Sequence, residues 1–223
     1  MRLIAHRGFA AINPENTIRA VRAAASVADA VEVDVRRCGS GELVVIHDAT
    51  VDRVTEGAGP VADHTLADLR SLDVLGTGEG VPTLSAVLAA VPDGVAVNVE
   101  LKATETAVEV VAVVSESSTD VWVSSFDQAA LAACRTADPT LPLGYLTAEG
   151  GRTAVRAAAR LDCIALPPAR RVCDERLVAR AHGAGLSVNA WTVDRPKTAR
   201  SLAAVGVDGV IADRPDLLPD PDE

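Results

Sequence analysis

Two short apolar runs in the sequence end in residues that could transfer protons and bind anions. Residues 3–5 lead into His6, Arg7 and Gly8, as expected for a buried strand that enters a turn. A histidine beside an arginine puts a proton carrier next to a fixed cation. The second run, 43–46, ends at His47. A histidine at a strand end is often only structural, so the interpretation depends on the residues that surround it.

Charged residues recur on segments that are otherwise typical of buried strands. Residues 31–35 alternate, which puts Glu32 and Asp34 on one face and three valines on the other. Residues 97–102 put Glu100 and Lys102 on one face in the same way. A buried carboxylate or ammonium is costly unless it is paired or binds something. Solvated strand ends, or a purely structural Glu–Lys pair, are the alternative explanations.

Three of these carboxylates form a candidate metal site. Glu32 and Asp34 would repel each other unless a cation lay between them, and Glu100 adds a third carboxylate. Hard oxygen ligands suit one divalent cation, Mg²⁺ or Ca²⁺ with Mn²⁺ as a further candidate, better than Zn²⁺. A turn signal at 39–41 folds the 43–48 segment back as a hairpin, which returns His47 to the same neighbourhood.

Such a set of residues predicts phosphodiester cleavage better than sugar or acyl chemistry. One of His6 and His47 could remove a proton from a nucleophile while the other protonates the leaving oxygen. Arg7 and Lys102 are placed to hold an anion such as a phosphate. Trp191 ends a predicted strand in a chain with few aromatic residues, and it either walls the substrate pocket or fills the core.

Strands and helices alternate regularly along the chain, which predicts an α/β (β/α)8 TIM barrel. A doubly wound open sheet is the main competitor, but no glycine-rich phosphate turn follows the first strand. We expect one catalytic domain over 1–223, with a small insertion of roughly 37–80 after the second barrel strand and a frayed tail at 216–223. Barrel strands are predicted at 3–7, 31–35, 95–101, 121–126, 142–146, 162–166, 186–192 and 208–212.

Composition excludes several classes of partner. The net charge is −10 and there is no basic stripe, so nucleic acid is not expected to bind. No apolar run reaches the ~18–20 residues that span a bilayer, and the N-terminus does not resemble a signal peptide. Stable membrane insertion is therefore not expected. The four cysteines have no C-x-x-C spacing, which favours reduced thiols in a cytoplasmic protein.

The order and spacing of short motifs over residues 3 to about 216 resemble the glycerophosphodiester phosphodiesterase family, which has phospholipase-C-like TIM barrels. The motifs are His6-Arg7-Gly8, Pro14-Glu15-Asn16-Thr17, Glu32-x-Asp34, His47-Asp48, Val81-Pro82-Thr83-Leu84, Glu100-Leu101-Lys102, Ser124-Ser125-Phe126, Trp191-Thr192-Val193 and Asp213-Arg214-Pro215. One departure is Ser85, because a glutamate commonly follows the Pro-Thr-Leu motif.

The resemblance implies hydrolysis of deacylated phospholipids, such as glycerophosphocholine and glycerophosphoethanolamine, to glycerol phosphate and an alcohol. It implies a small-molecule substrate. We separately expect a monomer or small homo-oligomer. It also implies a divalent metal on Glu32, Asp34 and Glu100, acid–base catalysis by His6 and His47, and phosphate contacts from Arg7 and Lys102.

Two other functions compete with this one. A related phospholipase-type phosphodiesterase would act on intact lipid, but it would need an exposed apolar rim that an acidic, aromatic-poor chain hardly offers. A catalytically silent barrel would only bind a phosphorylated metabolite. The presence of two histidines with three carboxylates disfavours it, because binding alone does not need two proton carriers.

Overall fold

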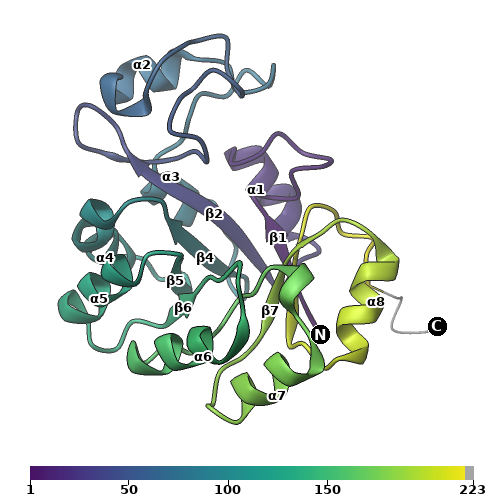
Figure 1. The fold of residues 1–223 in the computed structure, drawn as a ribbon. Coiled ribbons are helices and arrows are strands. Elements are labelled where there is room, and N and C mark those ends of the chain that lie inside the picture. The colour runs from purple at the N-terminus through teal and green to yellow at the C-terminus, as the bar shows by residue number, and fades with distance from the viewer. Residues whose placement is uncertain (219–223) are drawn as a thin grey trace.

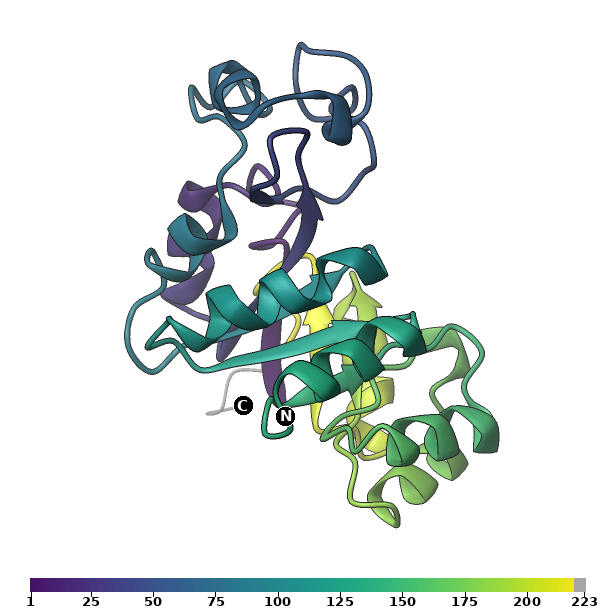
Figure 2. The ribbon, with the colours of Figure 1, turned by 90° about the vertical axis from the view of Figure 1, so that its left-hand side faces the viewer.

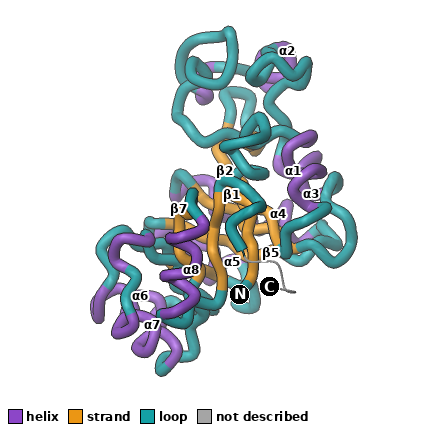
Figure 3. The backbone as a smooth tube through the Cα atoms, turned by 90° about the vertical axis from the view of Figure 1, so that its right-hand side faces the viewer, coloured by secondary structure: helices purple, strands orange, loops and turns teal. Residues whose placement is uncertain are grey.

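The computed structural model describes residues 1–218. In this part of the chain, parallel strands pair in the order β6-β5-β4-β2-β1-β8-β7, and the first and last strands are direct neighbours. Figure 3 shows the strands at the centre and the helices around them, the arrangement of an α/β TIM barrel, as predicted. The strands are β1 (Arg2–His6), β2 (Ala30–Arg37), β4 (Ala96–Leu101), β5 (Val121–Ser125), β6 (Leu143–Tyr145), β7 (Asn189–Val193) and β8 (Gly209–Ala212).

The barrel closes through the segment predicted as a strand over 162–166, which is not a continuous strand. Ala165 forms parallel bridges to β6 on one side and to Ser187, just before β7, on the other. Further bridges join Pro168 to Thr147 and Ala169 to Trp191, but no continuous ladder forms, because Pro167 and Pro168 have no N–H to donate. The eighth barrel position is therefore occupied by isolated bridges.

Helices connect successive strands and cover the outside of the sheet (Figure 1). Thr17 is the N-cap of the first helix and accepts a hydrogen bond from the backbone N–H of Ala20. No helix within residues 1–218 is long and apolar enough to cross a membrane. The barrel helices are α1 (Ile18–Ala25), α3 (Leu84–Leu88), α4 (Ala107–Ser115), α5 (Gln128–Ala137), α6 (Gly151–Arg160), α7 (Glu175–His182) and α8 (Pro196–Ala204).

Each strand has one face toward the helices and one toward the barrel axis. On β2, Val31, Val33 and Val35 are fully buried in the core beneath the helices. The opposite face of β2 begins with Ala30, which packs in a small apolar cluster with residues of β1, β5 and β8. Glu32 follows on that face, one step nearer the carboxyl ends of the strands. Because side chains alternate between the two faces of a strand, polar side chains lie at the mouth of the barrel.

The segment after β2 forms the predicted insertion (Figures 1 and 2, top). Its first strand, β3 (Leu43–Val45), pairs antiparallel with the end of β2, as predicted for the hairpin. A short helix, α2 (Leu66–Ser71), follows. A separate apolar cluster holds the insertion together, and it consists of Cys38, Val44, Ile46, Val51, Val54, Val61, Leu69, Val74 and Val81.

The C-terminal segment differs in part from the frayed tail predicted for 216–223. Leu217 is only 1% exposed and packs in the core of the barrel wall. The prediction is therefore wrong at this position, because the chain is still held by apolar contacts. The remainder of that stretch, 219–223, lies outside the described residues.

Candidate active site

The residues singled out in the sequence meet at the mouth of the barrel around a cavity of about 120 Å³. It is lined by His6, Arg7, Glu32, His47, Asn98, Glu100, Lys102, Phe126, Leu146, Trp191, Thr192 and Ile211. Asp34 lies directly beneath, in contact with Arg7 and Lys102. A larger hollow of about 830 Å³, between α3 and α4, has no histidine, lysine or arginine in its lining. The smaller cavity is therefore the candidate active site.

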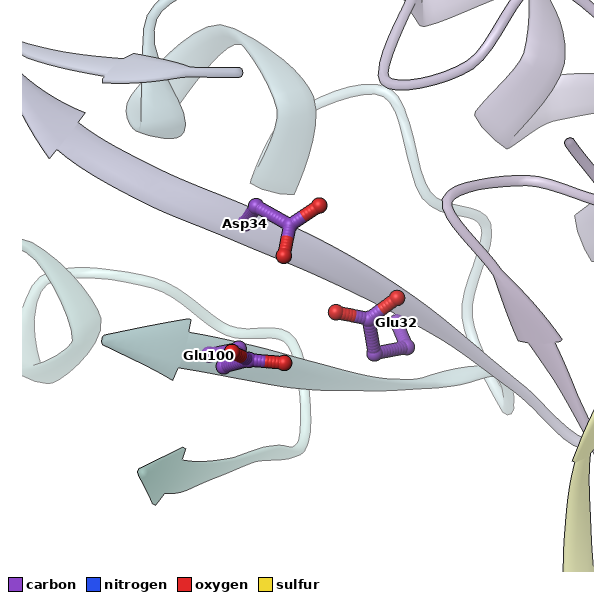
Figure 4. Close-up of side chains that lie close together, drawn as sticks. All are labelled: Glu32, Asp34 and Glu100. Atoms are coloured by element: carbon purple, nitrogen blue, oxygen red, sulfur yellow. The ribbon is translucent and has the colours of Figure 1, made fainter. Parts of the chain in front are cut away.

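Three buried carboxylates converge from two neighbouring strands (Figure 4). Asp34 on β2 lies opposite Glu100 on β4 in the parallel register, and Glu32 precedes it by one pleat. Oxygen atoms of the three side chains lie within 4.8 Å of one another. Burial and the negative charge of Asp34 raise the pKa of Glu32 to about 8. Burial would also raise the pKa of Asp34, but the positive charges of Lys102 and Arg7 outweigh it and lower the pKa.

This carboxylate set fits a hard divalent cation. Glu32 Oε1 is buried and has no hydrogen-bond partner among residues 1–218, and Asn98 Oδ1 beside it is in the same state. Such atoms are costly unless a ligand satisfies them. All the converging ligand atoms are oxygens, which Mg²⁺, Ca²⁺ and Mn²⁺ prefer.

His6 is held by carboxylates on both sides of its ring. Its Nδ1 lies 2.6 Å from Asp213 Oδ1, just after β8, and its Nε2 lies 3.9 Å from Glu32 Oε2. Because a carboxylate only accepts, Nδ1 carries a hydrogen and Nε2 is turned toward the cavity. Burial would lower the pKa of His6, but the hydrogen bond to Asp213 and the charge of Glu32 outweigh it, so the pKa is raised.

His47 comes from the insertion, two residues beyond β3. Its Nδ1 donates to Oδ1 of Asp48 at 2.6 Å, so Nε2 is again the free nitrogen. Burial lowers the pKa of His47 and outweighs the attraction of Asp34 and Asp48. Asp48 in turn accepts a hydrogen bond from Arg53, which is the main reason why its own pKa falls to about 2.

Arg7 and Lys102 bring the positive charge of the site. Arg7 Nε lies 3.0 Å from Asp34 Oδ2, and its Nη1 donates to Glu15 at 3.1 Å. Lys102 Nζ lies 2.7 Å from Asp34 Oδ1 and also donates to Glu100. Both cations border the cavity and are fixed by the carboxylates beneath it.

The glycine after Arg7 has a steric role. Gly8 has a φ of +78°, and a Cβ there would lie 2.8 Å from the backbone and side chain of Ala20 in α1. Only glycine allows both this backbone conformation and this close approach. The loop that carries Arg7 is thereby packed against the first helix.

Trp191 lines the cavity and also contacts the apolar cluster inside the barrel. Its ring meets Phe126 edge to face, with centroids 5.3 Å apart and an interplanar angle of 89°. Its indole N–H donates to the carbonyl of Pro167 at 2.9 Å. Trp191 therefore forms part of the pocket wall and also packs against the core, so each of the two alternatives is partly right.

Several residues at the site could be seen in the sequence but were not assigned a role there. Asp213, Glu15 and Phe126 stood only within motifs, and Arg53 was not singled out. Asp213 could have been found from topology, since a residue that follows the last strand of a closed barrel lies beside the end of the first. No local pattern marks Arg53, because its partners lie in two separate loops.

The fold and this site define a class, the α/β barrel enzymes with histidines and carboxylates at the mouth of the barrel. The model of the glycerophosphoryl diester phosphodiesterase family matches residues 6–217, and the chain belongs to this family.

Named relatives are similar over nearly their whole length. The chain is 35% identical to a glycerophosphodiester phosphodiesterase of Caldanaerobacter subterraneus subsp. tengcongensis, over 97% of this chain and 95% of the relative. A phosphodiesterase of Oleispira antarctica, solved with its product sn-glycerol-3-phosphate, superposes with a TM-score of 0.90 at 28% identity, over 96% of this chain and 94% of the other. The Thermotoga maritima glycerophosphodiester phosphodiesterase gives 0.84 at 26% identity, over 97% and 96%.

Proposed function

We propose that the protein hydrolyses glycerophosphodiesters, such as glycerophosphocholine and glycerophosphoethanolamine, to glycerol phosphate and an alcohol. The observation that carries the proposal is the meeting of two histidines, two cations and three carboxylates around one small cavity. Family membership and the product-bound relative support the same reaction. The cavity borders polar groups on one side and two aromatic rings on the other, which suits a small, water-soluble phosphodiester.

We assign the histidines opposite roles in the first step. His47, whose pKa is lowered, is the general base that takes a proton from the substrate's own glycerol hydroxyl as its oxygen attacks phosphorus. His6, whose pKa is raised, is the general acid that protonates the oxygen of the departing alcohol as its bond to phosphorus breaks. Water then opens the resulting cyclic phosphate to glycerol phosphate, with the roles of the two histidines exchanged. Each presents Nε2 to the cavity and is oriented through Nδ1 by a carboxylate. Two imidazoles with opposed pKa shifts are what a proton relay at neutral pH requires.

Arg7 and Lys102 are proposed to hold the phosphate oxygens, and Trp191 to form the apolar wall against the carbon skeleton of the substrate. Glu32, Asp34 and Glu100 are proposed to hold one divalent cation, Mg²⁺ or Ca²⁺ with Mn²⁺ as a further candidate. When bound, that ion neutralises charge on the phosphate and so favours attack on phosphorus.

The cysteines and the architecture support two further proposals, on the location of the enzyme and on its domain organisation. All four cysteines are free thiols, which is typical of a reducing compartment, so we propose that it acts in the cytoplasm. We further propose that the barrel and its insertion, roughly 37–80, act as one catalytic domain, in a monomer or small homo-oligomer.

The test measures glycerol phosphate release from glycerophosphocholine by metal-stripped protein, with Mg²⁺, Ca²⁺ or Mn²⁺ restored in turn. We expect release that depends on the metal and that disappears in Glu100→Gln. Absence of release with every metal, in protein shown to be folded by circular dichroism, would contradict the proposal. Arg37→Ala, which removes an exposed ion pair with Glu109 on the barrel wall, is a matched control and should keep full activity.

A further inference from the structure

Arg53, in the insertion, uses every nitrogen of its guanidinium to donate to carboxylates. Nε donates to Asp48 Oδ2 at 2.5 Å. Nη1 and Nη2 donate to the two oxygens of Glu15 at 2.7 and 2.8 Å. Two parallel bonds to one carboxylate fix the direction of a guanidinium as well as its position. Arg53 is therefore a rigid connection between two acidic side chains.

Both carboxylates also hold a residue of the active site. Asp48 accepts from His47 through its other oxygen, Oδ1, at 2.6 Å. Glu15 accepts from Nη1 of Arg7 at 3.1 Å. A continuous series of contacts thus runs from His47, through Asp48, Arg53 and Glu15, to Arg7.

The two ends of this series belong to different parts of the molecule. Arg53 lies between Val51 and Val54, which are 0% and 4% exposed in the apolar cluster of the insertion. Its backbone is therefore fixed by the insertion. Glu15 lies in the loop between β1 and α1, on the barrel. The guanidinium joins the two parts at the edge of the cavity.

We propose that Arg53 is a positioning residue that holds His47 of the insertion and Arg7 of the barrel in one geometry. This proposal rests on the function proposed above. Arg53 does not line the cavity, and each of its three nitrogens already donates to a carboxylate, so we assign it no contact with substrate. Its side chain is 47% exposed, and exposed ion pairs contribute little to stability. The effect of its loss is therefore expected in the rate and hardly in the unfolding temperature.

The test compares Arg53→Ala and Arg53→Lys with wild type and with Arg37→Ala, the matched control. We expect kcat to fall ~10-fold in Arg53→Ala, because a small displacement of an acid–base group is enough for such a loss. The unfolding temperature should stay near that of wild type. Lysine keeps the charge, but its single nitrogen cannot form the two parallel bonds to Glu15 together with the bond to Asp48, so Arg53→Lys should stay slow. Added guanidinium should restore part of the rate of Arg53→Ala and leave Arg37→Ala unchanged.

Two results would overturn the proposal. One is an Arg53→Ala enzyme with the kcat and KM of wild type. The other is full activity in Arg53→Lys, which would mean that charge alone is needed. Should Arg53→Ala fail to fold, Arg53→Lys decides by the same criterion.

A second measurement does not depend on turnover. The Nδ1–H resonance of His47 in NMR spectra should be sharp in wild type and broadened by exchange with water in both Arg53 variants. An unchanged resonance would also overturn the proposal. If wild type releases no glycerol phosphate with any metal, the proposed function fails, while this resonance still tests the role of Arg53.

Discussion

The two histidines at the site are positioned by different parts of the molecule. His6 ends a barrel strand and donates to Asp213 after the neighbouring strand, and its side chain is 17% exposed. His47 lies in the insertion, donates to the residue next to it in sequence, and is 34% exposed. The environments move the two pKa values in opposite directions. The closed barrel thus supplies a largely enclosed imidazole between two carboxylates, while the insertion supplies a more accessible one.

The largest effect is expected when either imidazole is removed. His6→Ala and His47→Ala should each lower kcat by ~10²–10⁴-fold, the usual contribution of acid–base groups. Binding of glycerol phosphate, measured by calorimetry, should persist because Arg7 and Lys102 are untouched. Turnover close to wild type in either variant would contradict the proposed pair.

Replacing the carboxylate that orients each histidine should lower kcat by different amounts at the two histidines. Asparagine in place of Asp213 or Asp48 keeps the shape but no longer favours a hydrogen on Nδ1. We expect kcat to fall ~100-fold in Asp213→Asn and ~10-fold in Asp48→Asn, within the range for groups that orient a functional histidine. The difference follows from burial, since water can partly replace a partner at the more exposed His47. The opposite order would show that the insertion controls its histidine more strictly than the barrel does.

The same core substitution in the two regions should have different catalytic consequences. Leu69 in the insertion and Leu131 in the barrel wall are both 0% exposed. Each Leu→Ala change should lower the free energy of unfolding by ~2–5 kcal/mol. Only Leu69→Ala should also lower kcat, by several-fold, because it loosens the cluster that carries His47 and Arg53. Denaturant titration and steady-state kinetics on both variants measure this, and an equal kcat in the two would count against a positioning role for the insertion.

The smallest expected effect is a pH dependence of the stability of the metal-free protein, caused by Glu32. The pKa of Glu32 is raised to about 8 in the fold, against 4.5 in the unfolded chain. The folded state therefore binds more protons between these values, and stability should decrease as pH rises through that interval. We expect the melting temperature of metal-stripped protein to fall by a few degrees over this range. Added Mg²⁺ or Ca²⁺, or Glu32→Gln, should remove most of the trend, and a flat profile in metal-free wild type would contradict the expected cause.

The sequence was sufficient to predict those parts of the fold that depend on alternation. Glu32, Asp34 and Glu100 share the inner face because side chains on a strand have a period of two, and parallel strands bring their ends together. The strand predicted at 162–166 was wrong, because the structure has only isolated bridges there. Its apolar residues favour a strand, but the two prolines after it limit hydrogen bonding. The insertion follows the predicted hairpin, because its turn residues lie between two β-type runs.

Contacts between distant loops could not be predicted in the same way. Asp213 and His6 are 207 positions apart, and Arg53 and Glu15 are 38 apart. Such pairs depend on the way in which whole elements pack, which no local period encodes. The Asp213 contact becomes predictable only once the closure of the barrel is known, and the Arg53 contact requires the path of the insertion as well.

The pairing of the first strand with the last has a consequence for the timing of biosynthesis. Asp213, the partner of His6, is translated 207 residues after it. At ~5–20 residues per second, this is roughly 10–40 s afterwards. A nascent or prematurely terminated chain therefore holds its first histidine without the carboxylate that orients it. The oriented state of His6 therefore forms only after β8 and Asp213 have been synthesised and β8 has paired with β1.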